Sequence, residues 1–552
     1  MIKQQILEDL KKTVESLGFS PTDPDPDLIG TNSIGTDIVL SSPKNPQFGD
    51  YSTNLALQLA KQPSAISYQS SEEIAKKILE KLGKPDYLEK AEIAGKGFIN
   101  FFIKDEILAG DLKEILKEKE NFGRSKKGQG KKARVEYISA NPTGPLHMGN
   151  ARGGPIGDVI ANIFDYTGYE VLREYIHNDV GEQVKALGAT VKAKYHGNLA
   201  SENQYQGEYV QELADKLNNE IEGKSDEEVG SMAVALLYEE IMADVHAMGI
   251  KFDLVVKESE LRKDAPVIIE ELKKIGVVKE KEGALWLAPN DEFLKDRETV
   301  IQKSDGGYTY FTADIVYHKI KFESGAKVII DVFGSNHHGH IPRLQAAASA
   351  LGFNPDKLKF ILYQYVRFKR GEEIIKMSKR AGNYITTREV LDEVGKDAFR
   401  FYILRFSPQT HIDFDLELLK QQTNKNPVYY VQYAHARMSN ILKKTQNSKF
   451  KIQNWDQVDY SQLKHSTEVS LIKHLLAFPD LVEELAANLQ VHQLSEYAIS
   501  LADLFHKFYE SCPVLQAENE ELKLARLALV EASKTTLANT LNLLGVSAPE
   551  KM

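Results

Sequence analysis

The residues best suited to handling a nucleotide lie in the loop NPTGPLHMGN, residues 141–150, between a predicted strand and a predicted helix. In an open parallel sheet, a nucleotide usually binds at such a loop, beyond the carboxyl end of the strand. Backbone N–H groups and the positive end of the following helix favour a triphosphate there. Gly149 lets a flat base approach the backbone, and His147 adds a donor that can follow developing charge. Taken alone, a histidine in a Gly/Pro-rich loop is more often structural.

A second cationic loop, KMSKRAG at residues 376–382, follows the strand pattern KLKFILYQYVRF. By itself this loop could be a solvated run of charge. Lys376 and Lys379, which flank Ser378, could instead hold pyrophosphate while negative charge moves onto the leaving group. The presence of both loops in this order within one chain favours the second interpretation.

The elements around the first loop alternate between strand and helix. The segments ARVEYIS, PIGDVIANIFDYTG and YEVLREYIH, between residues 133 and 177, predict a βαβ unit and therefore a parallel sheet. Strand patterns return at AKVIIDVFG and KLKFILYQYVRF. Polar, helical sequence at about residues 195–280 suggests an insertion between the two halves of that sheet.

The chain has 552 residues, which is too long for a single hydrophobic core. The predicted fold class is α/β: a parallel, Rossmann-like sheet, a small N-terminal α/β domain and a C-terminal all-α helical bundle. We place the domains at residues 1–122, 123–425 and 426–552. A Gly/Lys-rich segment without periodicity marks the first boundary, and the almost wholly helical pattern after Asn426 marks the second.

Composition limits the class of protein. Hydrophobic residues make up 42% and charged residues 27% of the chain, as in ordinary folded proteins. No apolar run approaches the roughly 20 residues that span a bilayer, and the first residues lack the apolar block of a signal peptide. The net charge of -10 argues weakly against indiscriminate binding to nucleic acid. We expect a cytoplasmic protein with no membrane partner.

Metal binding is not expected from the cysteine and histidine pattern. Cys512 is the single cysteine, which excludes an internal disulfide framework and a thiolate cluster. The segment FGSNHHGH, residues 333–340, holds three histidines, but no cysteine or carboxylate nearby completes a tetrahedral set. We therefore expect no structural zinc.

The two loops together resemble the two signatures of class I aminoacyl-tRNA synthetases. The longer stretches SANPTGPLHMGNARGG, from Ser139, and NPVYYVQYAHAR, from Asn426, resemble arginyl-tRNA synthetases within that class, and the resemblance covers nearly the whole chain. The chain departs from the family pattern at Asn150, where a second histidine is usual, and at Arg380. Asn150 still offers an amide donor to phosphate, but it cannot carry positive charge.

The resemblance implies an arginine–tRNA ligase of class I. Such an enzyme joins L-arginine to ATP as arginyl-adenylate, with Mg²⁺ bridging the phosphate oxygens, and then transfers arginine to the terminal adenosine of its tRNA. The resemblance also implies that arginine activation depends on bound tRNA. Because hydrogen bonding can select a guanidinium, a separate editing domain is not required. We expect a monomer.

The resemblance assigns roles to individual residues. The implied catalytic residues are His147, Asn150, Lys376 and Lys379. The implied ATP-binding residues are His147, Gly149, Asn150, Lys376, Met377, Ser378 and Lys379. The implied arginine-binding residues are Glu136, Asn141, Tyr310, Asp314, Asn336 and His337. A guanidinium presents five donors in a planar fork that carboxylates match bidentately. Tyr310 and Asp314, four residues apart, would share a helix face.

Two regions are expected to contact tRNA, namely the C-terminal bundle and the N-terminal domain. The implied contacts are Tyr430, Tyr433, Tyr509, Met552, Phe98 and Asn100. Flat side chains can stack on splayed bases, although each aromatic residue could instead belong to the core. Two other functions stay open: a class I synthetase for cysteine or glutamate, and a synthetase-like RNA-binding regulator that has lost catalysis.

Overall fold

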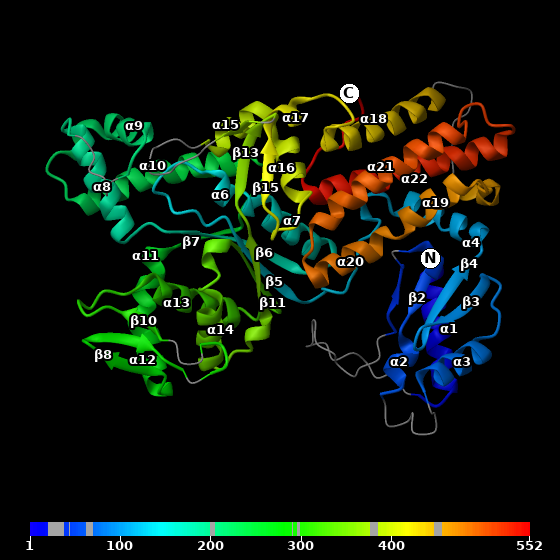
Figure 1. The fold of residues 1–552 in the computed structure, drawn as a ribbon, viewed down its shortest axis with the longest axis horizontal. Coiled ribbons are helices and arrows are strands. Elements are labelled where there is room, and N and C mark those ends of the chain that lie inside the picture. The colour runs from blue at the N-terminus through cyan, green and yellow to red at the C-terminus, as the bar shows by residue number, and fades with distance from the viewer. Residues whose placement is uncertain are drawn as a thin grey trace.

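A computed structural model gives the fold and describes residues 1–19, 38–43, 45–61, 70–198, 205–289, 291–294, 298–371, 373–375, 385–446 and 455–552. Over these ranges the molecule is elongated, with a parallel sheet near its centre (Figure 1). The N-terminal domain and a group of C-terminal helices lie towards one end. A helical insertion and a small antiparallel sheet lie towards the other end (Figure 1).

The N-terminal domain is an antiparallel sheet in the order β1-β2-β4-β3, packed against helices. Ile6 and Leu10 recur at helical spacing and bury one face of the first helix. The small N-terminal α/β domain is therefore confirmed as a fold. Its elements are α1 (Ile2–Ser16), β1 (Leu40–Ser41), β2 (Tyr51–Thr53), α2 (Leu55–Leu59), α3 (Ser71–Leu82), β3 (Leu88–Ala94) and β4 (Phe98–Ile103), followed by α4 (Asp105–Gly110) and α5 (Leu112–Glu118).

The central sheet has five parallel strands in the order β12-β11-β5-β6-β7. The strand that comes first in the chain lies in the middle, and later strands are added on both of its sides. The order therefore reverses between β5 and β11, and ligands bind at such a switch point in open α/β sheets. The strands are β5 (Lys132–Tyr137), β6 (Glu170–His177), β7 (Leu254–Lys257), β11 (Val328–Gly334) and β12 (Leu358–Tyr363).

Helices cover both faces of this sheet, and the alternation of side chains along β5 decides what each helix meets. Tyr137 faces α7 (Gly153–Tyr166), where a Cβ atom on Gly157 would lie 2.3 Å from the Tyr137 ring. Glu136 points to the opposite face and meets α13 (Tyr310–Glu323). One face of β5 is thus apolar, whereas the other carries charge beneath α13.

The insertion forms a unit with its own apolar core. Its helices α8 (Glu182–Tyr195), α9 (Glu208–Leu217) and α10 (Asp226–Ala247) bury Val191, Leu213 and Leu237 against one another. The structure departs from the predicted helical insertion near 195–280, because α8 begins before that range and the range is not wholly helical. Strand β7 falls inside that range and pairs with β6, because its short apolar run completes the edge of the central sheet.

The remaining part of the middle region supplies two small sheets and the helices beside them. One sheet has the order β10-β9-β8 and the other the order β14-β13-β15. Its elements are α11 (Glu258–Leu261), α12 (Ala265–Ile275), β8 (Val278–Lys281), β9 (Ala284–Leu287), β10 (Thr299–Gln302), α14 (Ile341–Ala350), β13 (Val366–Arg370), β14 (Glu373–Ile375), α15 (Thr387–Val394), α16 (Lys396–Leu404), β15 (Ile412–Asp415) and α17 (Leu416–Lys420).

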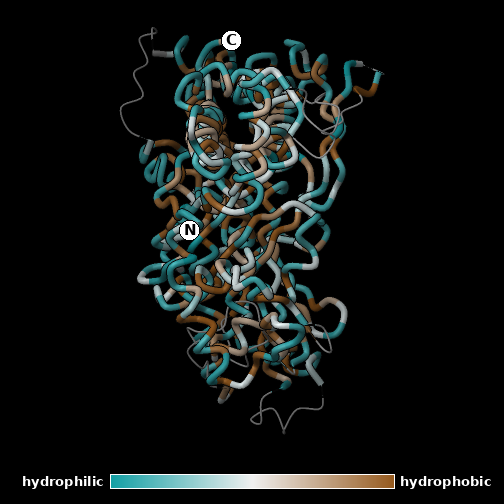
Figure 2. Tube along the Cα trace, turned by 90° about the vertical axis from the view of Figure 1, so that its left-hand side faces the viewer, coloured by the Kyte–Doolittle hydropathy of each residue, from teal (hydrophilic) through white to brown (hydrophobic). Residues whose placement is uncertain are grey.

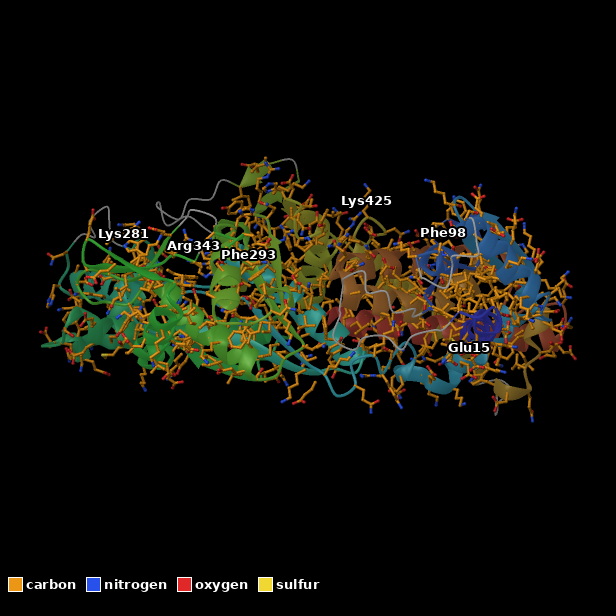
Figure 3. All side chains as sticks on the ribbon, turned by 90° about the horizontal axis from the view of Figure 1, so that it is seen from below. Glu15, Phe98, Lys281, Phe293, Arg343 and Lys425 are labelled. Carbon is orange, nitrogen blue, oxygen red and sulfur yellow. The ribbon has the colours of Figure 1, made fainter. Side chains whose placement is uncertain are left out.

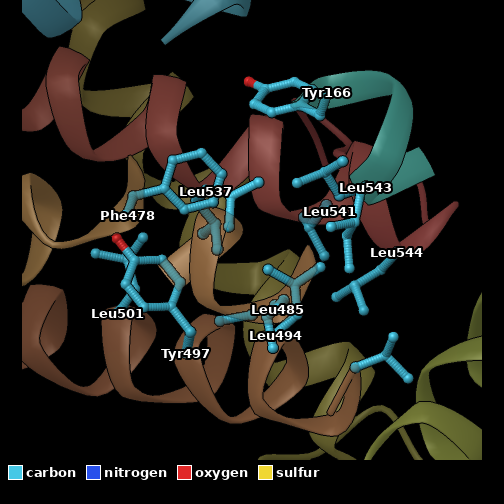
Figure 4. Close-up of a cluster of buried hydrophobic side chains, with 14 of the residues drawn as sticks. Tyr166, Phe478, Leu485, Leu494, Tyr497, Leu501, Leu537, Leu541, Leu543 and Leu544 are labelled. Carbon is cyan, nitrogen blue, oxygen red and sulfur yellow. The ribbon is translucent and has the colours of Figure 1, made fainter. Parts of the chain in front are cut away.

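The C-terminal part is a helical bundle, as predicted. Phe478, Tyr497 and Leu541 come from three of its helices and pack in one buried cluster, and Tyr166 of α7 joins them (Figure 4). The bundle therefore shares a continuous core with the central domain. Its helices are α18 (Pro427–Gln446), α19 (Ser466–Leu476), α20 (Phe478–Asn488), α21 (His492–Ser511) and α22 (Glu520–Leu544).

Hydrophobic and hydrophilic residues alternate closely along the trace (Figure 2). This alternation is typical of amphipathic elements that each bury one face. Among the described residues, no helix is both long enough and apolar enough to span a bilayer.

Candidate active site

A cavity of about 750 Å³ lies at the carboxyl ends of the central strands, at the switch point between β5 and β11. Its wall is formed by the loop after β5, the end of β11, one face of α13 and the start of α9. The predicted ligand-binding residues that line it are Glu136, Asn141, His147, Gly149, Asn150, Tyr310, Asp314, Asn336 and His337. Glu136 and His337, about two hundred positions apart in the sequence, therefore meet around one space.

The first loop leaves β5 through a constrained turn. Ile138 and Ser139 both have positive φ, of 68° and 35°, which is costly for a residue with a Cβ atom and rare for a β-branched one. The Ser139 hydroxyl fixes this turn, because it donates to Glu136 Oε1 at 3.0 Å and accepts from the Ile176 N–H at 3.1 Å. The turn directs the following residues, 140–150, into the cavity.

His147 precedes the short helix α6 (Met148–Ala151) and caps it. Its Nδ1 accepts a hydrogen bond from the Gly149 N–H at 3.0 Å. A neutral ring with Nδ1 as acceptor carries its proton on Nε2, which makes Nε2 a donor. Gly149 is exposed and Asn150 is half-buried at the same end of the cavity. This end can therefore offer an imidazole N–H, an amide and an open stretch of backbone to a nucleotide.

The second cationic loop is beyond the described part of the chain. The predicted residues Lys376, Met377, Ser378, Lys379 and Arg380 all lie outside the described residues. The chain resumes beside the first loop, where Thr386 forms an isolated bridge with His147 and the Thr387 N–H donates to the Leu146 carbonyl at 2.8 Å.

The part of the cavity wall formed by α13 carries a carboxylate, and we call it the acidic end. Tyr310 and Asp314 lie one turn apart on α13 and both line the cavity, as their spacing predicted. Asp314 Oδ2 lies 2.9 Å from His340 Nε2. Asn141 is held by two neighbours, since its amide donates to Gln183 Oε1 at 3.0 Å and its oxygen accepts from Asn178. Asn336 and His337 are exposed to the cavity just after β11.

Glu136 lines the cavity from strand β5 and is almost fully buried. Its Oε2 accepts from Lys321 Nζ at 2.6 Å, so the carboxylate already has a cationic partner within the protein. Burial raises the pKa of the Glu136 carboxyl, and the charge of Lys321 opposes that shift. A guanidinium could use only the remaining lone pairs of Glu136, which makes Asp314 the more accessible acceptor.

The acidic end stands on a buried charge network that joins α13 to the sheet. Lys321 Nζ also contacts Asp331 Oδ1 at 2.7 Å, and Asp331 Oδ2 lies 2.8 Å from His318 Nε2. The other ring nitrogen of His318 lies 2.8 Å from the Asp314 carbonyl. Both ring nitrogens of His318 therefore lie within hydrogen-bond distance of an oxygen atom, which fixes the orientation of the ring. Although burial opposes it, Lys321 and His318 hold the pKa of Asp331 well below its usual range.

The sequence predictions did not include the residues that position the acidic end. His318, Lys321 and His340 were not assigned there. Tyr209, whose hydroxyl donates to the Thr143 carbonyl of the first loop at 3.0 Å, was also not assigned to the cavity. The spacing of His318 and Lys321 in the sequence could have placed these two residues there. His318 and Lys321 follow Tyr310 and Asp314 at steps of three or four residues, so all four share one face of α13.

The described residues contain no group of three or more His, Cys, Asp and Glu side chains arranged to hold a metal ion. Two histidines of the run at 337–340 contact other side chains of the protein. His340 pairs with Asp314, and His337 stacks on Phe333 with ring centroids 5.3 Å apart.

The predicted tRNA contacts of the bundle gather on one surface. Tyr433, which is 36% exposed, stacks on Tyr429 with ring centroids 6.2 Å apart. The guanidinium of Arg437 lies 5.5 Å from the Tyr433 ring and 4.8 Å from the Tyr509 ring. The tail that ends at the exposed Met552 runs along α18, because the Pro549 carbonyl lies 2.8 Å from His435 Nδ1. Tyr430 is nearby, and its hydroxyl donates to Asp503 at 2.6 Å.

The two predicted contacts of the N-terminal domain differ in accessibility. Phe98 is 43% exposed at the surface of the domain (Figure 3). Asn100 is only 4% exposed, and its Oδ1 accepts from the Ser52 hydroxyl at 2.7 Å within the sheet. Phe98 and Asn100 lie two residues apart and therefore share one face of β4. Asn100 is covered there because it lies between Ser52 of β2 and Glu92 of β3.

Comparison with known proteins divides the chain into three matched regions. Residues 1–103 match the arginyl tRNA synthetase N terminal domain, residues 111–404 the catalytic domain of tRNA synthetases class I (R), and residues 431–552 the DALR anticodon binding domain. The central match alone covers more than half of the chain.

Curated relatives match along almost the full length. The arginine–tRNA ligase of Caldanaerobacter subterraneus subsp. tengcongensis is 42% identical over 542 residues, which are 95% of each chain. That of Carboxydothermus hydrogenoformans is 40% identical over 93% of this chain and 94% of its own. The solved arginyl-tRNA synthetase of Thermus thermophilus has the same fold, with a TM-score of 0.77 at 24% identity and full coverage of both chains. The chain therefore belongs to the arginyl-tRNA synthetase family of class I.

Proposed function

We propose that this protein charges a tRNA with arginine in two steps, through an arginyl-adenylate. The observation that carries the proposal is a single cavity lined by two groups of different chemistry. A loop suited to phosphate, at His147, and a carboxylate, Asp314, both line this one space. A molecule with a guanidinium at one end and a reactive carboxylate at the other would span the two.

In the first step, the arginine carboxylate attacks the α-phosphate of ATP and pyrophosphate leaves. We assign His147 Nε2 and the Asn150 amide to the phosphates, and the backbone at Gly149 to the adenine. Lys376 and Lys379 would hold the leaving pyrophosphate, with Met377 and Ser378 in the same loop. Mg²⁺ would be bound mainly by the phosphate oxygens and would neutralise their charge. Catalysis then comes from positioning and charge stabilisation, without a covalent enzyme intermediate.

At the acidic end we assign Asp314 as the principal partner of the guanidinium, with Tyr310 beside it on the same helix face. Glu136 adds negative charge from below, although Lys321 already shares it. Asn141, Asn336 and His337 would contact the rest of the amino acid. A ligand with a carboxylate side chain would be repelled by this end, which argues against a synthetase for glutamate.

In the second step, a ribose hydroxyl of the terminal adenosine of tRNA attacks the adenylate. We assign anticodon recognition to the aromatic surface of Tyr433 and Tyr509 in the bundle, since partly exposed rings offer a stacking platform for bases. Phe98 would contact the tRNA from the N-terminal domain. We expect the enzyme to act as a monomer in the cytoplasm.

Exchange of label between pyrophosphate and ATP tests the proposal. We expect exchange with arginine and not with cysteine or glutamate, and only when tRNA is present. Asp314→Asn should lower the efficiency with arginine by more than tenfold, because a charged partner lost from a paired site costs about 2 to 5 kcal/mol. It should leave the KM for ATP unchanged. Exchange at the same rate with and without arginine would contradict the assignment. Normal arginine kinetics in the Asp314→Asn variant would also contradict it.

A further inference from the structure

His340 already contacts the Asp314 carboxylate, which is the acceptor that the substrate guanidinium would need. It stands at the start of α14 and lines the cavity, and its Nε2 lies 2.9 Å from Asp314 Oδ2. The edge of its ring meets Phe311 and Phe333 at centroid distances of 5.5 and 6.4 Å. The two phenyl rings pack against the imidazole in this orientation, so its contact with Asp314 is part of the cavity wall in the free enzyme.

A guanidinium and the His340 ring compete for the same carboxylate. Bidentate pairing uses both oxygens of Asp314, and one of them is engaged by His340 Nε2. Two cations on one carboxylate would also repel each other. Arginine therefore cannot reach the full bidentate geometry while a protonated His340 remains in contact with Asp314.

The charged groups around His340 come from each element packed against it. Asp314 and His318 face the cavity from α13, His337 from the turn after β11, and Asp331 lies buried within β11. Arg343 follows on α14 and is exposed (Figure 3). Burial would lower the pKa of His340, but the hydrogen bond and the charge of Asp314 outweigh it and raise that pKa above its usual value. His337 differs, because burial and the nearby His340 lower its pKa.

We propose that His340 is a positioning residue that holds Asp314 in the free enzyme as an imidazolium–carboxylate pair, and that the arginine guanidinium replaces it with release of one proton to the buffer. This inference depends on the proposed pairing of Asp314 with the substrate. It makes His340 a determinant of arginine affinity that acts through Asp314, without contact with the reacting atoms.

The direction of the pH dependence follows from this replacement. Below the pKa of His340 in the free enzyme, the imidazolium is present and must lose its proton before arginine can bind. Above that pKa, the ring is already neutral. The KM for arginine should therefore fall as pH rises and then level off, with a slope no steeper than roughly tenfold per pH unit for one proton.

The test is the KM for arginine in aminoacylation between pH 6 and 8.5, at saturating ATP and tRNA, for four proteins. They are the parent, His340→Gln, His338→Gln and Asp314→Asn. The glutamine at 340 keeps an N–H donor for Asp314 but cannot be protonated. His338 is exposed, is not part of the cavity wall, and provides the matched control.

We expect the KM of the parent and of His338→Gln to fall at least about threefold from pH 6 to pH 8, within the limit for one proton. His340→Gln should show a flat profile and a lower KM than the parent at pH 6. A purely structural role would only weaken binding. An unchanged slope in His340→Gln overturns the inference. If Asp314→Asn still binds arginine poorly in that case, the proposed function stands by itself.

Calorimetry of the parent gives a second readout that needs no variant. Arginine is titrated into the protein at one pH in phosphate and in Tris, whose heats of ionisation differ. A difference in apparent enthalpy that corresponds to proton release supports the inference. Equal enthalpies in the two buffers, at a pH where the KM is still changing, would overturn it.

Discussion

Lys321→Met should damage both the stability of the central domain and the arginine end of the cavity. Lys321 is fully buried, and its Nζ contacts Glu136 at 2.6 Å and Asp331 at 2.7 Å. Methionine fills a similar volume but leaves two buried carboxylates without their shared cation. Removal of one partner from a buried ion pair typically costs about 3 to 5 kcal/mol, and here one substitution affects two pairs.

The loss should depend on pH with a definite sign. Without Lys321, burial would raise the pKa of Glu136 further, because desolvation is already the larger influence. A carboxyl whose pKa is raised in the folded state binds protons more readily there than in the unfolded chain, so stability falls as pH rises. The variant should therefore be closest to the parent near pH 5.5 and furthest from it near pH 8.

Urea unfolding followed by tryptophan fluorescence measures this effect. The chain has two tryptophans, and a Trp455→Phe background leaves Trp286 of β9, in the small sheet whose strand β10 packs against α13. Lys319→Met is the control, because Lys319 lies on the same helix but pairs with Glu323 at the surface. If Lys321→Met loses less than about 1 kcal/mol at pH 8, as expected for an exposed pair, the network does not support α13 in the way described.

Two further substitutions test the assignments at the other sites. Lys379→Ala should slow single-turnover formation of the adenylate by a barrier increase of about 2.7 to 4 kcal/mol, while tRNA affinity is retained. An unchanged rate would remove Lys379 from the mechanism. Tyr433→Ala should weaken tRNA binding by roughly 1 to 3 kcal/mol with an unchanged melting temperature, since the ring is partly exposed. A lowered melting temperature would instead identify Tyr433 as a core residue.

The sequence was most informative where a local pattern determines position. The βαβ pattern predicts that a loop after β5 opens at the carboxyl edge of the sheet, and His147 lies there. The four-residue step from Tyr310 to Asp314 predicts a shared helix face, and both residues line the cavity. These predictions succeed because strand direction and helical period decide which way a side chain points, whatever the rest of the fold does.

Pairings between distant segments could not be predicted in this way. In the sequence, His340 is one of three histidines that follow a strand pattern. No feature of the sequence near it indicates a contact with Asp314, which lies on an earlier helix. Asn100 is a second example, because it shares a face of β4 with the exposed Phe98 and is covered only by the neighbouring strands that pair with β4 on either side. The predicted insertion contains β7, since an apolar run of only four residues forms a strand when β6 is present to pair with it.

The charged face of α13 gives the acidic end a rigid set of buried ion pairs, while the contact between His340 and Asp314 above them can change. Tyr317, His318 and Lys321 tie the helix to Glu174, Asp331 and Glu136 on three different strands, all in buried positions. Such pairs hold only at correct geometry, so Asp314 is presented at a fixed height above the sheet. His340 approaches from α14 and contacts Asp314 from the cavity side. Its departure would free the carboxylate without disturbing the pairs below. Substitutions in the buried network should therefore change stability and arginine affinity together, whereas substitutions at His340 should change affinity alone.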